Sequence, residues 1–299
     1  MKEPHHTGSA TLGDRTAPGI ALIIVARDAA TTIERCIASA TSIVKSVLVV
    51  DSFSEDDTVA LAKRAGAVVL QRPFLNYSDQ RNWASEQIGQ SAEWLLHLDS
   101  DEYLTPELAT EIARHVQEAS PETTGFLIRR RVVFLGREIR HGGLAATWHL
   151  RIYRPTCGRC EDRRYDQHFM TSGASARLKG FFVDDNGASL ERWIDRHNRW
   201  SSAEAEELLN PSPEATRVTP TLNGTPINRK RWLKDRFWSR LPMLWRPFAY
   251  FTYRYVFCLG FLDGREGLIF HVLQGFWFRF LVDSKAFERT RFPERDERD

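Results

Sequence analysis

The sequence predicts an α/β fold with a doubly wound, mainly parallel sheet, and two observations lead to this prediction. Up to Pro121, short apolar runs alternate with stretches of helical periodicity, a pattern typical of strands joined by crossover helices. These runs also lack the polar–apolar alternation of a half-exposed strand. We therefore expect helices to cover both faces of the sheet.

The individual elements follow from periodicity and from capping residues. We expect strands at residues 20–26, 47–50, 67–70 and 94–98. Helices should begin near Ile33, at Ser54 with Asp57 in a capping-box spacing, near Ser78, and after Thr105 with Pro106 in the first helical position. Gly66 should end the second of these helices.

The pattern changes after Pro121. Longer apolar stretches at residues 125–135 and 147–153 predict antiparallel additions to the sheet. Residues 156–187 are expected to be mostly loop, residues 190–209 an amphipathic helix, and the Pro- and Thr-containing residues 210–228 a linker. We accordingly divide the chain into a flexible tail (1–18) and a main domain (19–228).

Composition narrows the function classes. The 299 residues are 42% hydrophobic and 27% charged, which suits a globular protein, and the net charge of +2 does not by itself imply a polyanion partner. The four cysteines make no disulfide framework, so a reducing, cytoplasmic setting fits best, and the Cys157–Cys160 pair lacks the second pair that a structural zinc site needs. Residues 1–18 have no apolar core, so we expect no signal peptide or membrane anchor there.

Two carboxylates end the fourth apolar run, at Asp99 and Asp101. The carboxyl end of a parallel strand faces the crevice where open α/β sheets bind ligands. Alternate residues of an extended chain point the same way, so both carboxylates can reach one hard cation and, through it, a diphosphate. The alternative is that this Asp-Ser-Asp only begins a loop.

The C-terminal part is basic and aromatic. Between Arg229 and Tyr255 the chain carries eight Lys or Arg, one Asp and nine aromatic residues. This composition favours a helix lying in a lipid headgroup layer, and we expect residues 229–288 to associate with a membrane surface. Packing on the main domain and, less favoured, nucleic-acid binding are the alternatives. Residues 289–299 are expected to form a charged tail.

Four segments together resemble family 2 glycosyltransferases of GT-A fold, particularly the bacterial branch that extends lipopolysaccharide core or related envelope glycans. They are Ala26-Arg27-Asp28, residues 49–58 around Asp51, Gln80-Arg81-Asn82, and residues 98–102. The resemblance implies that Ala26, Asp28, Asp51, Arg81 and Asp99 bind the nucleotide sugar, and that Asp99 and Asp101 hold a divalent metal, Mg²⁺ or Mn²⁺. The family usually has Asn-Glu where this chain has Asp28-Ala29.

Family 2 enzymes invert configuration, which requires a carboxylate base on the face of the sugar opposite the leaving group. Residues 161–169 supply the candidates, and we favour Asp166 over Glu161 and Asp162. The alternative is that the acid only pairs with a neighbouring arginine. His197 lies in a predicted helix and is expected to pack rather than react.

The sequence thus predicts an inverting, metal-assisted glycosyltransferase. It would move a sugar from a nucleotide-diphosphate donor to a lipid-linked or envelope glycan acceptor, peripherally on the cytosolic face of the inner membrane. Two other functions stay open: a non-catalytic nucleotide-sugar-binding, membrane-associated protein, and a D-x-D phosphohydrolase. The phosphohydrolase is disfavoured because its motif usually follows an early strand, whereas this one follows the fourth.

Overall fold

The protein is described here by a computed structural model that covers residues 19–144, 147–163, 166–185, 187, 189–213, 228, 232 and 241–292. The predicted tail at 1–18, most of the predicted linker and nearly all of the basic stretch 229–240 lie outside the described residues.

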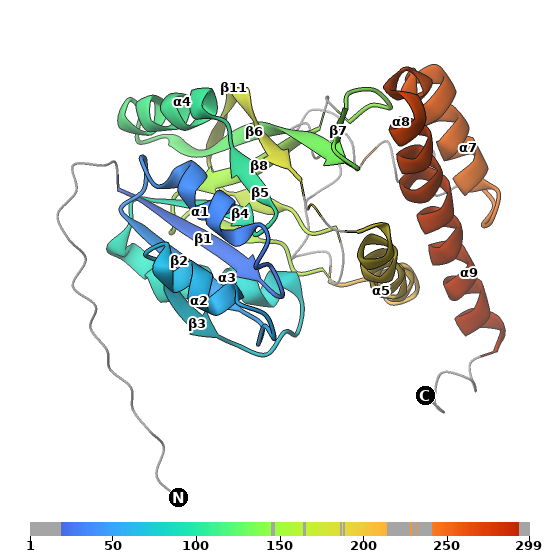
Figure 1. Ribbon diagram of the computed structural model, residues 1–299, viewed down its shortest axis with the longest axis horizontal. Helices are drawn as coiled ribbons and strands as arrows, with labels where there is room; N and C mark the ends of the chain where they lie inside the picture. Colours follow the sequence, from blue (N-terminus) through green and yellow to red (C-terminus); the bar gives the residue numbers. More distant parts are fainter. Residues whose placement is uncertain are drawn as a thin grey trace, which may run out of the picture.

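The first half of the chain forms the predicted parallel sheet (Figure 1). Its strands are β1 (Ile20–Ala26), β2 (Ser46–Asp51), β3 (Val68–Gln71) and β4 (Trp94–Asp99), in the order β3-β2-β1-β4. They are connected by α1 (Ile33–Ala40), α2 (Thr58–Arg64), α3 (Tyr77–Ile88) and the short η1 (Gly89–Ser91). All three strand pairs are parallel, which confirms the doubly wound arrangement.

The second half extends the same sheet with mixed directions. β8 (Trp148–Tyr153) runs antiparallel to β4, and β6 (Thr123–Phe134) runs antiparallel to β8. The sheet continues through β11 (Ala174–Asp184) to β5 (Glu102–Leu104), while β7 (Arg137–Ile139) pairs with β6. α4 (Pro106–Gln117) follows β5, and the Thr105 hydroxyl accepts a bond from the Leu108 amide, as its predicted cap position requires.

One expected loop region is largely structured. Residues 156–187 contain a small hairpin, β9 (Gly158–Cys160) with β10 (Phe169–Thr171), and the long strand β11. The prediction of mostly loop was wrong because β11 has a bulge at its centre, and its first residues have few large apolar side chains. Pairing along β6 stabilises this strand, and this contact between distant segments has no local sequence signal.

The cap predicted for α2 was also wrong. The helix begins at Thr58, and no side chain caps it from the N-cap residue Asp57. The Ser54 hydroxyl instead donates to Asp51, and the Thr58 amide donates to Asp56. Ser54 therefore serves the loop after β2 rather than the helix.

Two apolar layers enclose the sheet. One contains α1, α2 and α4 residues such as Ile33 and Ile112, packed on strand residues such as Ile24. The other lies beneath α3 and includes Ala84, Leu127 and other residues of β1, β2, β4, β6 and β8. Burial on both faces explains the continuous apolar runs of the parallel strands.

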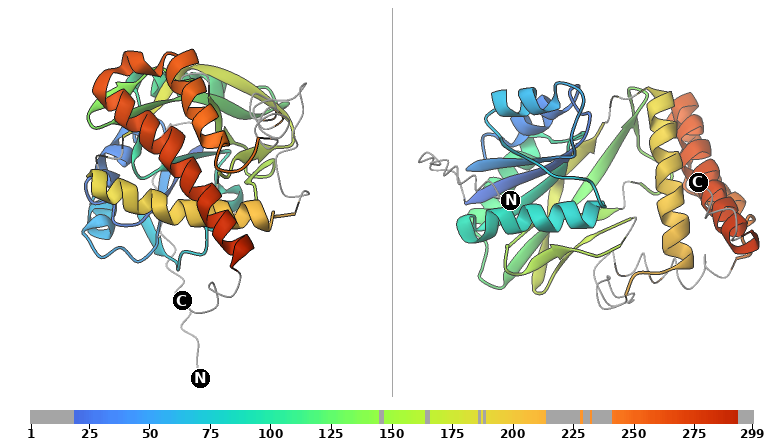
Figure 2. Two further views of the ribbon diagram at one scale, coloured as in Figure 1. Left: turned by 90° about the vertical axis from the view of Figure 1, so that its right-hand side faces the viewer. Right: turned by 90° about the horizontal axis from the view of Figure 1, so that it is seen from below.

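The C-terminal helices pack on the main domain (Figure 2). They comprise α7 (Arg246–Thr252), η4 (Tyr253–Phe257), η5 (Gly260–Asp263), α8 (Gly264–Phe270), η6 (His271–Trp277) and α9 (Phe278–Arg291), and they contact α5 (Leu190–Leu209) of the main domain. Buried Phe278 and Val282 of α9 pack with Ala205 of α5. α9 extends three residues into the predicted charged tail, where Arg289 pairs with Glu206 at 3.0 Å. Within the described residues, no helix has the length and apolar character needed to cross a bilayer.

The loop before β8 joins the C-terminal helices to the sheet. Asp263 is buried, and its carboxylate accepts the His141 backbone N–H at 2.9 Å and lies 2.7 Å from His141 Nδ1. Arg254 Nε donates to the Gly142 carbonyl at 2.9 Å. Gly142 has φ of +72°, and a Cβ there would lie 2.1 Å from the buried His271 ring, so glycine is required at this joint.

Candidate active site

The predicted D-x-D residues lie at the carboxyl end of β4, next to the carboxyl end of β1. Asp99 is the last residue of β4 and aligns with Val25 of β1, and Asp101 lies in the turn before β5. Their side chains are 32% and 21% exposed, so solvent and ligands reach both carboxylates. The apolar strand places them there, because its buried residues leave only the end of the strand open.

Asp99 is held between two arginines. Arg81 Nη2 of α3 donates to Asp99 Oδ1 at 2.6 Å, and Arg151 Nη2 of β8 lies 3.6 Å from Asp99 Oδ2. Burial acts to raise the pKa of Asp99, but the two guanidinium groups outweigh it and hold this pKa well below its usual range. Asp99 is therefore ionised throughout the physiological pH range.

Arg151 also neutralises a carboxylate in the interior. Its guanidinium donates to Glu102, which is only 2% exposed, and Glu102 Oε2 accepts the backbone N–H of Asp99 at 2.9 Å. Burial raises the pKa of Glu102, and Arg151 opposes this. The Arg151–Glu102 pair thus fixes the backbone at the end of β4. We did not single out Arg151 from the sequence, where it is one arginine within an apolar strand.

Asp101 is in a different electrostatic environment. Burial and the nearby Asp184 raise its pKa to about 6, although Arg196 Nη1 of α5 lies 3.2 Å from its Oδ2. Asp101 is therefore the more readily protonated of the two D-x-D carboxylates. Arg196 is another residue that the sequence did not indicate. It precedes His197, which is buried against Trp193 and has its pKa lowered to about 4 by burial, consistent with the expected packing role.

The loops after β1 and β2 are tied together by the acids predicted to bind the nucleotide. Asp51 is fully buried next to Ala26, and accepts the Ser54 amide at 3.0 Å and Gln71 Nε2 at 3.1 Å. Asp28 Oδ1 accepts the Glu55 amide at 2.9 Å. Both carboxylates therefore shape these loops, and Asp51 has no surface through which to touch a ligand in this conformation.

Phe53 lies on the second of these loops and was missed by sequence reasoning. Its side chain is 51% exposed, and its φ of +56° is a genuine outlier for a bulky residue. Such backbone strain costs about 1–3 kcal/mol and clusters at ligand-binding sites. Phe53 is therefore a candidate to stack on a nucleotide base.

Helix α3 connects three parts of the site through consecutive residues. Gln80 Nε2 donates to the Ser52 hydroxyl of the loop after β2 at 3.1 Å, and Arg81 reaches Asp99. Asn82 exchanges two hydrogen bonds with Cys160, of 3.0 and 2.8 Å. The Gln80-Arg81-Asn82 motif therefore fixes the loop after Cys160, which carries Asp166, relative to the D-x-D residues.

Asp166 itself is exposed and has φ of +55°. Glu161 at the start of the same loop is fully buried, and its Oε1 accepts the His168 amide at 2.8 Å. Glu161 is thus a structural residue that closes the loop on which Asp166 lies. Neither Arg164 nor Tyr165 is among the described residues.

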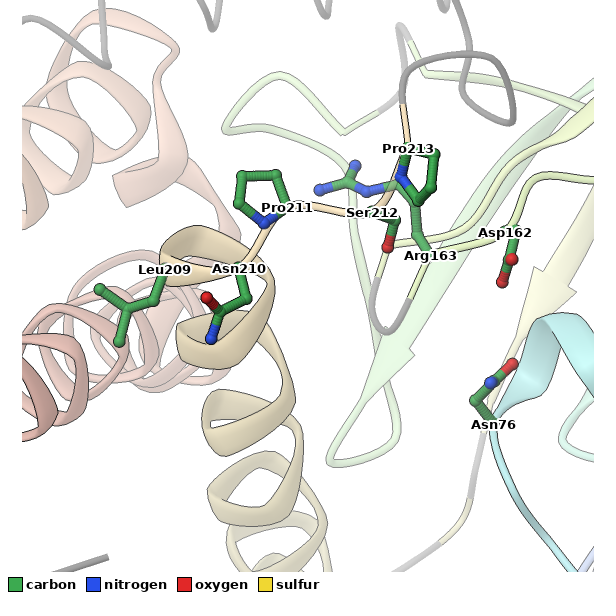
Figure 3. Close-up of a pocket in the computed structure, with 8 residues that line it drawn as sticks. All are labelled: Asn76, Asp162, Arg163, Leu209, Asn210, Pro211, Ser212 and Pro213. Carbon is green, nitrogen blue, oxygen red and sulfur yellow. The ribbon is translucent and has the colours of Figure 1, made fainter. Parts of the chain in front are cut away.

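An open pocket of about 590 Å³ lies beside this loop (Figure 3). The pocket is lined by Asn76 at the start of α3, by Asp162 and Arg163 of the loop, and by residues 209–213, from the last residue of α5 onward. Arg163 pairs with the buried Glu207 at 3.2 Å, so the pocket wall is fixed by an ion pair. The pocket therefore lies between the Asp166 loop, the start of α3 and the end of α5.

The carboxylates at the end of β4 fit a divalent cation of the Mg²⁺ type. Within the described part of the chain, no three His, Cys, Asp or Glu side chains converge into a closed cage. Mg²⁺, however, is usually held by one or two carboxylates, with water and substrate phosphates completing its shell. Asp99 and Asp101 supply such accessible oxygen ligands, and Arg196 would have to leave Asp101 for both to serve.

Comparison with known proteins defines the class. Residues 21–182 match the family Glycosyl transferase family 2, and the chain belongs to this family. It is a glycosyltransferase, which removes the phosphohydrolase alternative. The α/β class and the C-terminal helical segment predicted with this resemblance are likewise confirmed.

Individual relatives cover most of the chain. An uncharacterized glycosyltransferase of Rickettsia felis is 25% identical over 268 residues, 84% of this chain and 85% of the relative. One of Rickettsia conorii is 24% identical over 288 residues, 91% and 90% of the two chains. Among solved structures, S. aureus TarS 1-349 is similar with a TM-score of 0.46 and 15% identity over 91% of each chain. Glucosyl-3-phosphoglycerate synthase of Mycobacterium tuberculosis has a TM-score of 0.32 and 21% identity, over 44% of this chain and 51% of that one.

The Arg151–Glu102 pair gives a stability prediction. Arg151→Met should lower the free energy of unfolding by about 3–5 kcal/mol, because it leaves the Glu102 charge buried and unpaired. The double variant Arg151→Met/Glu102→Gln should lose clearly less, since no charge is then stranded. Arg64→Met removes an exposed pair with Glu34 and should cost at most about 1 kcal/mol. Urea unfolding measures all three, and equal losses in the single and double variants would contradict this account.

Proposed function

We propose that the protein is an inverting glycosyltransferase that uses a nucleotide-diphosphate sugar and a divalent cation. The observation that carries the proposal is the position of Arg81. This one side chain contacts Asp99, and its helix is bonded both to the loop after β2 and to the Asp166 loop. The loops after β1 and β2 would receive the nucleoside, with Phe53 against the base and Ala26 and Asp28 beside it. The buried Asp51 would support these loops from below in this conformation.

The charges at the end of β4 suit a diphosphate leaving group. Asp99 and Asp101 would hold the cation, which would neutralise charge developing on the diphosphate as the glycosidic bond breaks. Arg81 lies within reach of the same region and stays charged beside Asp99. Arg196 pairs with Asp101, and it would become available to the phosphates once a cation takes its place.

The transfer itself needs a base on the acceptor side. An acceptor hydroxyl oxygen would attack the anomeric carbon, and its proton would pass to Asp166. The bond from the anomeric carbon to the diphosphate oxygen breaks, and the nucleoside diphosphate leaves with the electron pair, so the configuration inverts. Asp166 is exposed on a loop that Glu161 and Asn82 hold in place, which supports this assignment over the buried Glu161.

We further propose that the acceptor is a lipid-linked or envelope glycan, as in lipopolysaccharide core assembly, handled at the cytosolic face of the inner membrane. Most of the exposed large apolar side chains of the described residues lie between Leu241 and Phe292. Trp245 and Phe257 are 73% and 74% exposed there. A helical unit that packs through one set of apolar residues and exposes another is suited to a lipid surface.

The cation assignment predicts a loss of binding in Asp101→Asn. The variant should bind a nucleoside diphosphate no better with Mn²⁺ than without it, while the thermal unfolding temperature stays close to that of the wild type. Asp195→Asn, on an exposed α5 position, is the control and should keep the Mn²⁺ effect. Calorimetric titration measures both variants. Mn²⁺-dependent binding that persists in Asp101→Asn would remove Asp101 from the site.

The same assignment has a pH signature. The pKa of Asp101 is raised to about 6, so protons and cations should compete for it below that pH. Wild-type affinity for Mn²⁺ should therefore fall by up to about tenfold for each pH unit below 6. Above pH 6 it should be nearly constant.

The base assignment predicts that Asp166→Asn lowers kcat by about 10²–10⁴ and leaves donor affinity unchanged, because a base acts only in the transition state. Asp162→Asn, also exposed on the same loop, is the matched control and should keep kcat within a few-fold of wild type. Transfer to a glycan acceptor and donor binding are measured in parallel. Normal turnover in Asp166→Asn, or an equal loss in Asp162→Asn, would place the base elsewhere.

The membrane proposal predicts that Trp245→Ser/Phe257→Ser weakens binding to anionic vesicles by about tenfold or more, since burying each ring contributes about 1.5–3 kcal/mol. Leu75→Ser is the control, because Leu75 is 75% exposed but lies in the loop before α3. Raising salt should weaken binding only in part. Vesicle co-sedimentation measures the affinity of each variant. Equal vesicle binding by the double variant and the control would mean that these helices only pack on the main domain.

A further inference from the structure

The mixed half of the sheet carries a cluster of cations stacked on aromatic rings, which we call the arginine–tryptophan patch. It consists of Arg129, Arg131, Trp148, Arg177, Lys179 and Phe181. The Arg129 guanidinium lies 5.3 Å from the Trp148 ring centre and 4.3 Å from that of Phe181. The Arg177 guanidinium lies 5.2 Å from the centre of the same Trp148 ring. The rings therefore hold several guanidinium groups together.

Strand register places this patch on the same face of the sheet as the donor site. Trp148 aligns with Arg129, Phe181 with Arg129, and Arg177 with Leu127. Leu127 belongs to the apolar layer beneath α3, and Trp148 packs against that layer. Arg81 reaches Asp99 from α3, so Asp99 opens to this face as well.

The patch also lies at the correct end of the sheet. β8 runs antiparallel to β4, so its first residue, Trp148, is at the end where β4 finishes with Asp99. Figure 1 shows β8, β6 and β11 between the parallel strands and the C-terminal helices. The donor loops lie on the other side of β4, after β1 and β2. With the donor on those loops, an acceptor that attacks opposite the leaving group would arrive from the side of β8.

The charge of the patch is largely unbalanced. Arg131 lies 3.4 Å from Glu138, but Arg129, Arg177 and Lys179 pair with no carboxylate of the described residues. Arg129 donates one bond to the Lys179 carbonyl at 3.0 Å, while its buried Nε has no acceptor. Gathering like charges on one face is unfavourable unless a ligand neutralises them, so the patch is suited to an anion.

We propose that the arginine–tryptophan patch is the acceptor subsite and that it takes a sugar bearing a phosphate or carboxylate group. The indole of Trp148 offers an apolar surface to a sugar ring, and Arg177 with Lys179 binds the anionic substituent. This inference rests on the proposed function and adds to it the chemical class of the acceptor. Neutral glycans would leave the cations without a partner and would bind more weakly.

Binding of small probes to the full chain tests the patch without turnover. The indole ¹H–¹⁵N signal of Trp148, assigned by its loss in Trp148→Phe, is followed during titration with glucose 6-phosphate, glucuronate, glucose and inorganic phosphate. We expect the two anionic sugars to shift the signal and to bind about tenfold or more tighter than glucose or inorganic phosphate. Equal affinity for glucose, or for inorganic phosphate, would overturn the proposal.

Charge variants give the matched comparison. Arg177→Gln/Lys179→Gln removes two exposed cations and should weaken anionic sugar binding about tenfold or more. Arg114→Gln/Lys63→Gln removes two exposed cations from helices on the opposite face of the sheet and should leave it unchanged. Unaltered sugar binding in Arg177→Gln/Lys179→Gln would overturn the proposal. So would a variant that loses only its binding to phosphatidylglycerol vesicles, because the patch would then face lipid.

Nucleoside diphosphate binding with Mn²⁺ tests the donor site separately from the acceptor subsite. It should be the same in the wild type and both charge variants, because none of these residues contacts the loops after β1 and β2. Absence of this binding in the wild type would refute the proposed function. Normal nucleotide binding without selectivity for anionic sugars would refute only the acceptor subsite.

Discussion

The ion pair between Arg81 and Asp99 is the interaction on which the site depends. It is formed by the end of an apolar strand and a buried guanidinium, and both charges would be costly without their partner. The neighbours of Arg81 in sequence extend the constraint, since Gln80 bonds to the loop after β2 and Asn82 to Cys160. One turn of α3 therefore fixes the loop after β2, the D-x-D residues and the Asp166 loop relative to one another.

The two D-x-D carboxylates have different electrostatic roles because their neighbours differ. Asp99 has two arginines and remains ionised, whereas Asp101 has one arginine and the like charge of Asp184, which raises its pKa to about 6. The first is a permanent fixed charge that also positions Arg81. The second is the more readily protonated, and this would suit its proposed role as a carboxylate that accepts a cation arriving with substrate.

The C-terminal helices are a structural part of the catalytic domain as well as a candidate lipid surface. Asp263 and Arg254 hold the His141–Gly142 loop that leads into β8, and β8 contributes Arg151 and Trp148. The C-terminal helices therefore help to position β8 through this loop. The two alternatives for this segment, packing and membrane binding, are compatible because they use different apolar residues.

The sequence alone determined the parallel half of the sheet, the helix after Thr105 and the position of Asp99 and Asp101, because apolar periodicity, caps and strand ends are local properties. It did not determine β11, whose pairing with β6 is a contact between distant segments, or the true role of Ser54, which bonds to Asp51 rather than capping α2. The sequence alone also did not identify the arginines that set the charges of the site. Arg151 meets Glu102 across 49 residues and Arg196 meets Asp101 across 95, and only the folded chain brings such partners together.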